Sequence, residues 1–173
     1  MFLTDVRIPP GNLIGEPDRG WSVALATLQG ERTAIGGVGG GPAIDELMAL
    51  ARKGGAESDR VLRDRVAAVY SRARVFPFLR ERSQEGSVLK LFLSQHVAGA
   101  SELAVDLLAS AGMLTGDDGP ERGRWVTELV GHFSYRIGGG TDEMQRNLIG
   151  ERVLGLPPDQ RVDKGVPFRQ IPS

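Results

Sequence analysis

Apolar residues recur at steps of three and four positions over most of the chain, and this period constrains the fold more than any other feature. Such spacing places apolar side chains on one face of an α-helix. The period covers residues 18–38, 43–52, 58–76, 87–111, 121–137 and 141–154. No internal repeat and no alternation of strands with helices accompanies it. We therefore predict an all-α protein in which four or five antiparallel helices form an up-down bundle.

Local signals predict where these helices begin and end. Asp18 and Ser58 precede helical stretches and can accept hydrogen bonds from the first backbone amides as N-caps. The run GGVGGGP at 36–42 should end a helix, because each interior glycine costs about 1 kcal/mol. Propensity alone leaves open whether residues 18–52 form one helix or two. Pro77 should interrupt or kink the next helical stretch.

The two ends of the chain differ from the helical body. Residues 1–17 combine apolar Val6 and Ile8 with the turn sequence Pro9–Asn12, which predicts a short extended segment. An isolated strand is marginal, so this segment is interpreted as the exit of a β-sheet that lies elsewhere. Residues 18–156 form the predicted helical bundle, and residues 157–173, which contain several prolines, form an irregular tail.

The composition excludes several classes of protein. The chain has 21 basic and 22 acidic residues, which argues against the clustered basic excess of a nucleic-acid-binding protein. It has no cysteine, which is consistent with a reducing cytoplasm, and its two histidines, His96 and His132, lie too far apart to suggest a metal centre. We expect no signal peptide, and no apolar run approaches the ~20 residues that span a bilayer. A cytoplasmic location is therefore expected.

Glu31 is the first candidate site residue. Its helical neighbours at three and four steps are Thr27, Leu28, Ala34 and Ile35, none of which is basic, so its own helix offers no ion partner. It lies beside an apolar stripe, and partial desolvation there would make its carboxylate a stronger general base. The alternative is a glutamate at the edge of the core that pairs with an arginine from another helix.

Two glycine-rich runs are further candidates. The run at 36–41 lacks the Gly-Lys-Ser/Thr ending of a phosphate loop and fails the GxGxxG spacing, so helix packing or a helix bend is favoured. The run Gly138–Gly140 opens a helix, whose free N–H groups could bind an anion or polar cofactor atoms. An ordinary loop with Thr141 as N-cap explains the second run equally well.

Taken together, three stretches resemble the acyl-CoA dehydrogenase family, and their order and spacing fit over nearly the whole chain. The first resembles the exit from the family's middle β-domain, the second the first long helix of its C-terminal domain, and the third the signature of its last helices. The stretches are residues 5–21, Leu28-Gln29-Gly30-Glu31-Arg32, and Arg136–Arg146 with Ile149, Glu151, Arg152, Leu154 and Gly155.

The resemblance implies an FAD-dependent α,β-dehydrogenation of an acyl-CoA thioester. In that reaction a glutamate removes the α-proton, the β-hydrogen leaves as hydride to the flavin, and the electrons pass to an acceptor of the electron-transfer flavoprotein type. A homo- or hetero-oligomer, with FAD held partly between subunits, is also implied. The glycine block at 36–41 would then lie inside one long helix.

This sequence departs from the family pattern at the usual base, which most members carry in a Glu-Gly-Thr motif before the last helix. Gly139 occupies that position here. A minority of members place the base on the earlier helix, directly before an arginine, and Glu31-Arg32 matches that arrangement. The resemblance therefore implies that Glu31 is the catalytic base. It assigns cofactor contacts to Gly140, Thr141 and Glu143, although Glu143 stands where glutamine is commoner.

Other departures leave a second interpretation open. The arginine-rich Phe-Gly segment that usually touches the cofactor is not evident, and the N-terminal helical domain and most of the β-domain are missing. This fragment alone should therefore be inactive and should not hold FAD tightly. The alternative is a non-catalytic helical subunit or assembly module that pairs with an active chain. If Glu31 is the base, the space freed near Gly139 predicts a branched or bulky acyl group.

Overall fold

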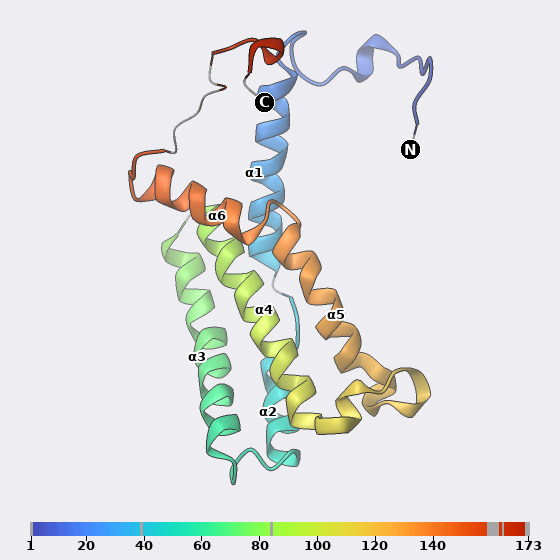
Figure 1. Ribbon diagram of the computed structural model, residues 1–173, viewed down its shortest axis with the longest axis vertical. Helices are drawn as coiled ribbons and strands as arrows, with labels where there is room; N and C mark the ends of the chain where they lie inside the picture. The colour runs from blue at the N-terminus through green and yellow to red at the C-terminus, as the bar shows by residue number, and fades with distance from the viewer. Residues whose placement is uncertain (1, 39, 84, 159–162, 164, 172–173) are drawn as a thin grey trace.

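The computed structural model describes residues 2–38, 40–83, 85–158, 163 and 165–171. These residues form α-helices and short helical turns and contain no β-strand (Figure 1). The helices are α1 (Gly20–Val38), α2 (Ile44–Lys53), α3 (Arg60–Arg82), α4 (Gly86–Leu108), α5 (Arg124–Ile137) and α6 (Asp142–Leu148). A π-helical turn, Ile149–Val153, continues α6. The predicted all-α class is confirmed.

The helices form an up-down bundle around α4. In Figure 1, α1 and α2 follow each other down the long axis, α3 returns upward, α4 runs down and α5 runs up. The central helix α4 contacts α1, α2, α3, α5 and α6. α6 crosses the bundle near the end at which α4 begins (Figure 1). This crossing brings the loop between α5 and α6 close to α1 and to the first turns of α4.

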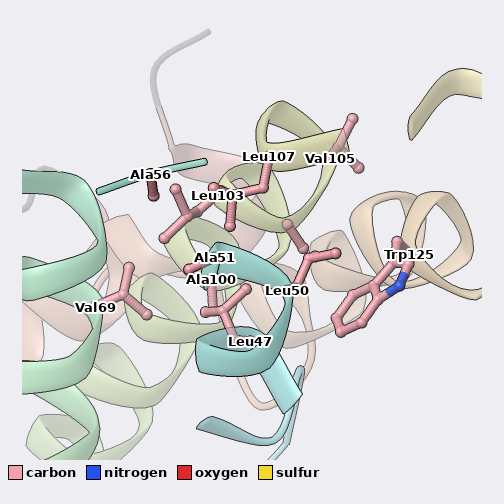
Figure 2. Close-up of a cluster of buried hydrophobic side chains, with 11 residues drawn as sticks. Leu47, Leu50, Ala51, Ala56, Val69, Ala100, Leu103, Val105, Leu107 and Trp125 are labelled. Carbon is pink, nitrogen blue, oxygen red and sulfur yellow. The ribbon is translucent and has the colours of Figure 1, made fainter. Parts of the chain in front are cut away.

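The core lies along α4, because small and apolar residues cover nearly all of its surface. Leu103 and Ala104 are fully buried, and a buried leucine side chain contributes about 1.5–3 kcal/mol. The larger hydrophobic cluster joins α2, α3, α4 and α5 (Figure 2). Its buried members are Leu47, Leu50, Ala51, Ala56, Val69, Ala100, Leu103, Ala104, Val105, Leu107 and Trp125. A smaller cluster of Phe76, Leu89, Leu93 and Val97 joins α3 to the first half of α4.

The chain leaves the helical path between α1 and α2. α1 ends at Val38, and the described residues from Gly40 to Ala43 are not helical. A Cβ on Gly40 would lie 2.5 Å from the Tyr135 hydroxyl, so a larger residue would displace that side chain of α5. Gly41 has φ +77°, which L-residues rarely adopt. The expectation of one long helix through this block was therefore wrong, and the close packing expected of the glycines is present.

Several local expectations about helix ends need correction. Asp59, not Ser58, caps α3, and its carboxylate accepts hydrogen bonds from the backbone amides of Val61 and Leu62, in the first turn, at 2.8 and 3.1 Å. Ser58 instead donates its hydroxyl to the Gly55 carbonyl. Asp18 lies two residues before α1 and has φ +64°, so it is not the N-cap. Pro77 does not end α3, which continues to Arg82.

The segment before α1 carries apolar side chains that the helical body does not cover. It contains a 3-10 turn, Pro10–Asn12, but no strand in its described part, residues 2–19. Its exposed apolar residues are Phe2, Leu3, Val6, Ile8, Leu13 and Ile14. Part of the predicted irregular tail lies outside the described residues, and its described part forms turns and the 3-10 turn Phe168–Gln170. No helix in the described part of the chain is long and apolar enough to cross a membrane.

Candidate active site

The loop between α5 and α6 has a backbone that only glycine adopts easily. Gly139 and Gly140 have φ values of +67° and +97°. A Cβ on Gly140 would lie 2.8 Å from the side-chain nitrogen of Gln145, so a larger residue would displace that side chain. The loop therefore turns sharply from α5 into α6 and has no side chain of its own until Thr141.

Thr141 is the N-cap of α6 and directly precedes its first residue, as the sequence predicts. Its hydroxyl accepts a hydrogen bond from the amide of Met144 at 3.3 Å, which is the geometry of an N-cap. Glu143 follows in the first turn, is exposed, and forms an ion pair with Arg146 at 3.5 Å. Hydrogen bonds to its own backbone amide and to Thr141 lower the pKa of Glu143 below its usual value. Glu143 is therefore an exposed anion that stabilises the start of α6.

Gln145 holds the glycine loop from beneath. Its side chain is fully buried, and its amide nitrogen donates to the carbonyl oxygens of Gly139 at 2.9 Å and Gly140 at 3.3 Å. The oxygen of the same side chain is buried and has no hydrogen-bond partner among the described residues. A buried polar atom without a partner is costly, so this position favours a further donor.

Asp142 is the most strongly held charge near the loop. It is 1% exposed, and one carboxylate oxygen accepts from the Ser94 hydroxyl at 2.6 Å and from the Lys90 ammonium at 3.2 Å. The other oxygen accepts from Arg136 at 3.1 Å. Burial alone would raise the pKa of Asp142, but the hydrogen bonds from Ser94, Lys90 and Arg136 outweigh it and lower the pKa.

Arg32 joins α1 to the same loop. Its Nε donates to the carbonyl oxygen of Gly139 at 3.1 Å. Two sequence-predicted elements of the site, the Glu31-Arg32 pair and the glycine loop, are thus neighbours although they lie far apart in the sequence. Gly140 and Thr141 are within one or two residues of this contact, whereas the exposed Glu143 side chain pairs away from it with Arg146.

Glu31 itself differs from expectation. Its side chain is exposed in this chain, so the partial desolvation expected from the apolar stripe is absent. The alternative, an ion pair with an arginine of another helix, is also absent from the part of the chain that the structure describes.

Sequence reasoning missed the buried residues that support the loop. Lys90 is fully buried, although lysine seldom is unless paired. One signal was available, because Lys90 is the only charged residue between Glu85 and Glu102, in the most apolar helix of the chain. A charge in such a helix must find a buried partner. The sequence does not say that Asp142 is that partner.

The two histidines are separate and buried. His96 lies in α4, and its Nδ1 has no hydrogen-bond partner among the described residues. Burial, assisted by the charge of Arg72, lowers the pKa of His96. His132 lies in α5, contacts the Leu129 carbonyl and packs on the Phe133 ring. Among the residues that the structure describes, no three His, Asp or Glu side chains are grouped so that they could hold a metal ion.

Comparison with known proteins identifies the family. Residues 56–154 match the family described as acyl-CoA dehydrogenase, C-terminal domain. This chain belongs to the acyl-CoA dehydrogenase family. The acyl-CoA dehydrogenase IpdE1 of Mycobacterium tuberculosis is 32% identical over 170 residues, covering 91% of this chain and 43% of the relative. IpdE1 of Mycolicibacterium smegmatis is 31% identical over 166 residues, covering 91% and 42%. This chain therefore spans less than half the length of these two curated relatives.

Solved structures share the fold of this dehydrogenase chain. A structure described as the Tcur3481-Tcur3483 steroid ACAD superposes with a TM-score of 0.75 at 19% identity, covering 91% of this chain and 45% of the other. The ChsE4-ChsE5 complex from Mycobacterium tuberculosis superposes with a TM-score of 0.70 at 24% identity, covering 92% and 46%. At identities of 19% and 24%, these superpositions show that the chains share a fold. The resemblance of the chain to the acyl-CoA dehydrogenase family is confirmed.

Proposed function

We propose that this chain is the C-terminal helical domain of an FAD-dependent acyl-CoA dehydrogenase, in which Glu31 removes the α-proton of the thioester. The observation that carries the proposal is the hydrogen bond from Arg32 to the Gly139 carbonyl. It brings the helix that carries Glu31 to the loop where, by the family resemblance, most members hold their base. A base on α1 can thus serve the same reaction centre from the other side of the loop.

The exposure of Glu31 suits this role in a larger protein. An acyl group or a further domain that covers the carboxylate removes water from it, which makes a carboxylate a stronger base toward a weakly acidic C–H bond. Arg32 directs its Nε to the loop and forms no ion pair with Glu31 among the described residues. The two adjacent side chains thus have separate tasks, proton removal for Glu31 and attachment of the helix for Arg32.

The residues of the loop fit a bound flavin. Gly140 and Thr141 are partly exposed, and no backbone acceptor in the described part of the chain takes their N–H groups. These groups would hold polar atoms of FAD, and the absence of side chains at the glycines lets a planar ring approach the backbone. When bound, FAD accepts the β-hydrogen as hydride.

The proposed substrate is a thioester with a bulky acyl group. Gly139 has no side chain at the position that the resemblance assigns to the usual base, which leaves room beside the reacting carbons. Two of the structures with this fold are described as steroid ACADs, so polycyclic acyl-CoA thioesters are the first class to test. Electrons would pass to an acceptor of the electron-transfer flavoprotein type, and the protein would act in the cytoplasm.

A silent partner subunit is the second candidate. The solved structures described as Tcur3481-Tcur3483 and ChsE4-ChsE5 each name two chains, so relatives with this fold occur in pairs. The exposed apolar segment before α1 also requires a covering surface that the helical body does not supply. In this candidate the chain supports the flavin site of a homo- or hetero-oligomer, and another chain supplies the base.

The test uses the complete protein that carries this chain, loaded with FAD and kept free of oxygen. It is titrated with straight, branched and polycyclic acyl-CoA thioesters while flavin absorbance is followed. Bleaching in the native protein and in Glu57→Gln, an exposed glutamate in another part of the chain, but not in Glu31→Gln, is the expected result. Equal bleaching in Glu31→Gln would remove Glu31 as the base. Bound FAD that no thioester bleaches would favour the silent partner.

A further inference from the structure

We propose that Lys90 and Asp142 are positioning residues, whose buried ion pair holds the glycine loop and, through Gly139 and Arg32, fixes the helix that carries Glu31. The proposal deepens the proposed function, since its meaning for the reaction depends on Glu31 as the base. Its structural part does not depend on that role, because it concerns contacts within this chain.

The pair is set apart from the other ion pairs by its burial. The side chains of Lys90 and Asp142 are 0% and 1% exposed. By contrast, Arg65 and Asp106 form an ion pair at 2.6 Å with side chains 40% and 51% exposed. A surface pair contributes little, whereas a buried charge that loses its partner is strongly destabilising. Replacement of a whole buried pair by apolar residues is often neutral for stability, so such a pair suits a role in specifying geometry.

The network holds both ends of the loop. The Lys90 ammonium donates to the Arg136 carbonyl at 3.3 Å, in the last turn of α5, and to Asp142 at 3.2 Å, the first residue of α6. Ser94, one turn further along α4, donates to the same carboxylate oxygen at 2.6 Å. Glycine backbones have the greatest conformational freedom of any residue. Anchoring the residues on either side of Gly138–Gly140 to α4 removes much of that freedom.

The loop in turn orients α1. The Gly139 carbonyl accepts from Arg32 at 3.1 Å and from the buried Gln145 at 2.9 Å. Because successive residues of a helix point about 100° apart, holding Arg32 on one side sets the direction in which Glu31 points. A shift of the loop would therefore move the Glu31 carboxylate relative to the substrate. Misplacement of a reacting group by about 1 Å can cost about a hundred-fold in rate.

The test separates positioning from simple stability. Lys90→Met, Asp142→Leu and the double variant are made in the complete protein, with Arg65→Met/Asp106→Leu as the exposed matched control. Thermal midpoints and amide hydrogen exchange are measured for peptides covering 28–34 and 136–146. Each single variant should unfold at a lower temperature. The double variant should regain most of the thermal midpoint that the single variants lose. Its backbone amides should nevertheless exchange about tenfold faster than those of the native protein in both peptides. The control should leave both readouts unchanged.

A kinetic readout tests the link to Glu31. In the double variant the rate of flavin reduction at saturating thioester should fall at least about tenfold, with KM within about twofold of native, because proton removal and not substrate binding is impaired. Should the charge variants fail to fold, Ser94→Ala removes one donor to Asp142 without leaving a charge unpaired. It should speed exchange in 136–146 several-fold and lower the reduction rate, with a smaller loss of thermal midpoint than either single charge variant.

The outcomes separate this proposal from the proposed function. Native exchange in both peptides of the double variant, or of Ser94→Ala, would overturn it. Faster exchange in 136–146 with native exchange in 28–34 would overturn its second step, from the loop to α1. If Glu31→Gln bleaches as well as native while the exchange results are as expected, the network still positions the loop, and the assignment of the base fails.

Discussion

Arg32 on α1 donates a hydrogen bond to the carbonyl oxygen of Gly139, 107 residues further along the chain. Gly139 has φ +67° and no side chain, and its carbonyl oxygen also accepts a hydrogen bond from the side-chain amide of Gln145. A single backbone carbonyl thus joins α1, the loop after α5, and α6. The contact places the helix that carries Glu31 next to the glycine loop.

Replacement of Arg32 tests this contact. Arg32→Lys keeps the charge but loses the planar guanidinium, so the hydrogen bond from Nε to Gly139 is lost. We expect a loss of about 0.5–1.5 kcal/mol in the free energy of unfolding and a larger relative loss in the rate of flavin reduction. Chemical denaturation and anaerobic flavin absorbance measure the two effects. Arg52→Lys, on the exposed surface of α2, should change neither.

Gly140→Ala tests the backbone of the loop. Its φ is +97°, and the new Cβ would lie 2.8 Å from the Gln145 side-chain nitrogen, so we expect destabilisation of about 1–3 kcal/mol. Gly131 is the matched control, because it lies within α5 and has nothing within 4 Å of an added Cβ. Gly131→Ala should stabilise by about 1 kcal/mol. Denaturant midpoints of the two variants should therefore move in opposite directions, and a shift in the same direction would contradict this account of the loop.

The stability of the protein should depend on pH through Asp142. Its pKa is lowered in the folded state, because hydrogen bonds from Ser94, Lys90 and Arg136 outweigh the cost of burial. The unfolded chain therefore takes up this proton at a higher pH than the folded chain does. The contribution of Asp142 to stability is present above the ordinary aspartate pKa and is lost as the pH falls through the pKa of Asp142 in the folded state. Between about pH 7 and pH 3, urea unfolding should show that the free energy of unfolding falls more steeply for the native protein than for Asp142→Asn. Parallel curves for the two proteins would argue against this role of Asp142.

His96 should make the stability of the protein depend on pH in a second range, nearer to neutral. Its pKa is lowered from the ordinary 6.5 by burial and by the charge of Arg72. Below that value the unfolded chain binds a proton that the folded chain still excludes, so the free energy of unfolding falls as the pH decreases. His96→Gln should remove this loss between about pH 6.5 and pH 5. Thermal midpoints of both proteins across that interval provide the measurement.

The helical class and the cap of α6 could be predicted because both depend on local sequence. The three- and four-residue period needs only neighbouring turns, and Thr141 caps the helix that it directly precedes. Local signals were ambiguous where two residues competed, as Asp59 and Ser58 did for the start of α3. An ionised carboxylate is the stronger acceptor for backbone amides, which accounts for the outcome.

Contacts between distant segments could not be predicted in the same way. After α1 ends, Gly40 packs against Tyr135 on α5, and the apolar period of α1 does not predict that contact. Likewise, Lys90 could be recognised as an isolated charge in an apolar helix, but its partner Asp142 is 52 residues away. The exposure of Glu31 also depends on which surfaces lie near α1.

By itself the sequence determined the all-α class, the cap of α6, the glycine loop and the family, because these depend on side-chain period, backbone propensity and motif spacing along the chain. Tertiary structure decided that Arg32 meets Gly139 and that Lys90 is neutralised by Asp142. It also decided that Glu31 stays uncovered in this chain. The physical reason is that burial and ion pairing are properties of residues brought together by packing, and packing of α1, α4 and α6 is set by all their contacts at once.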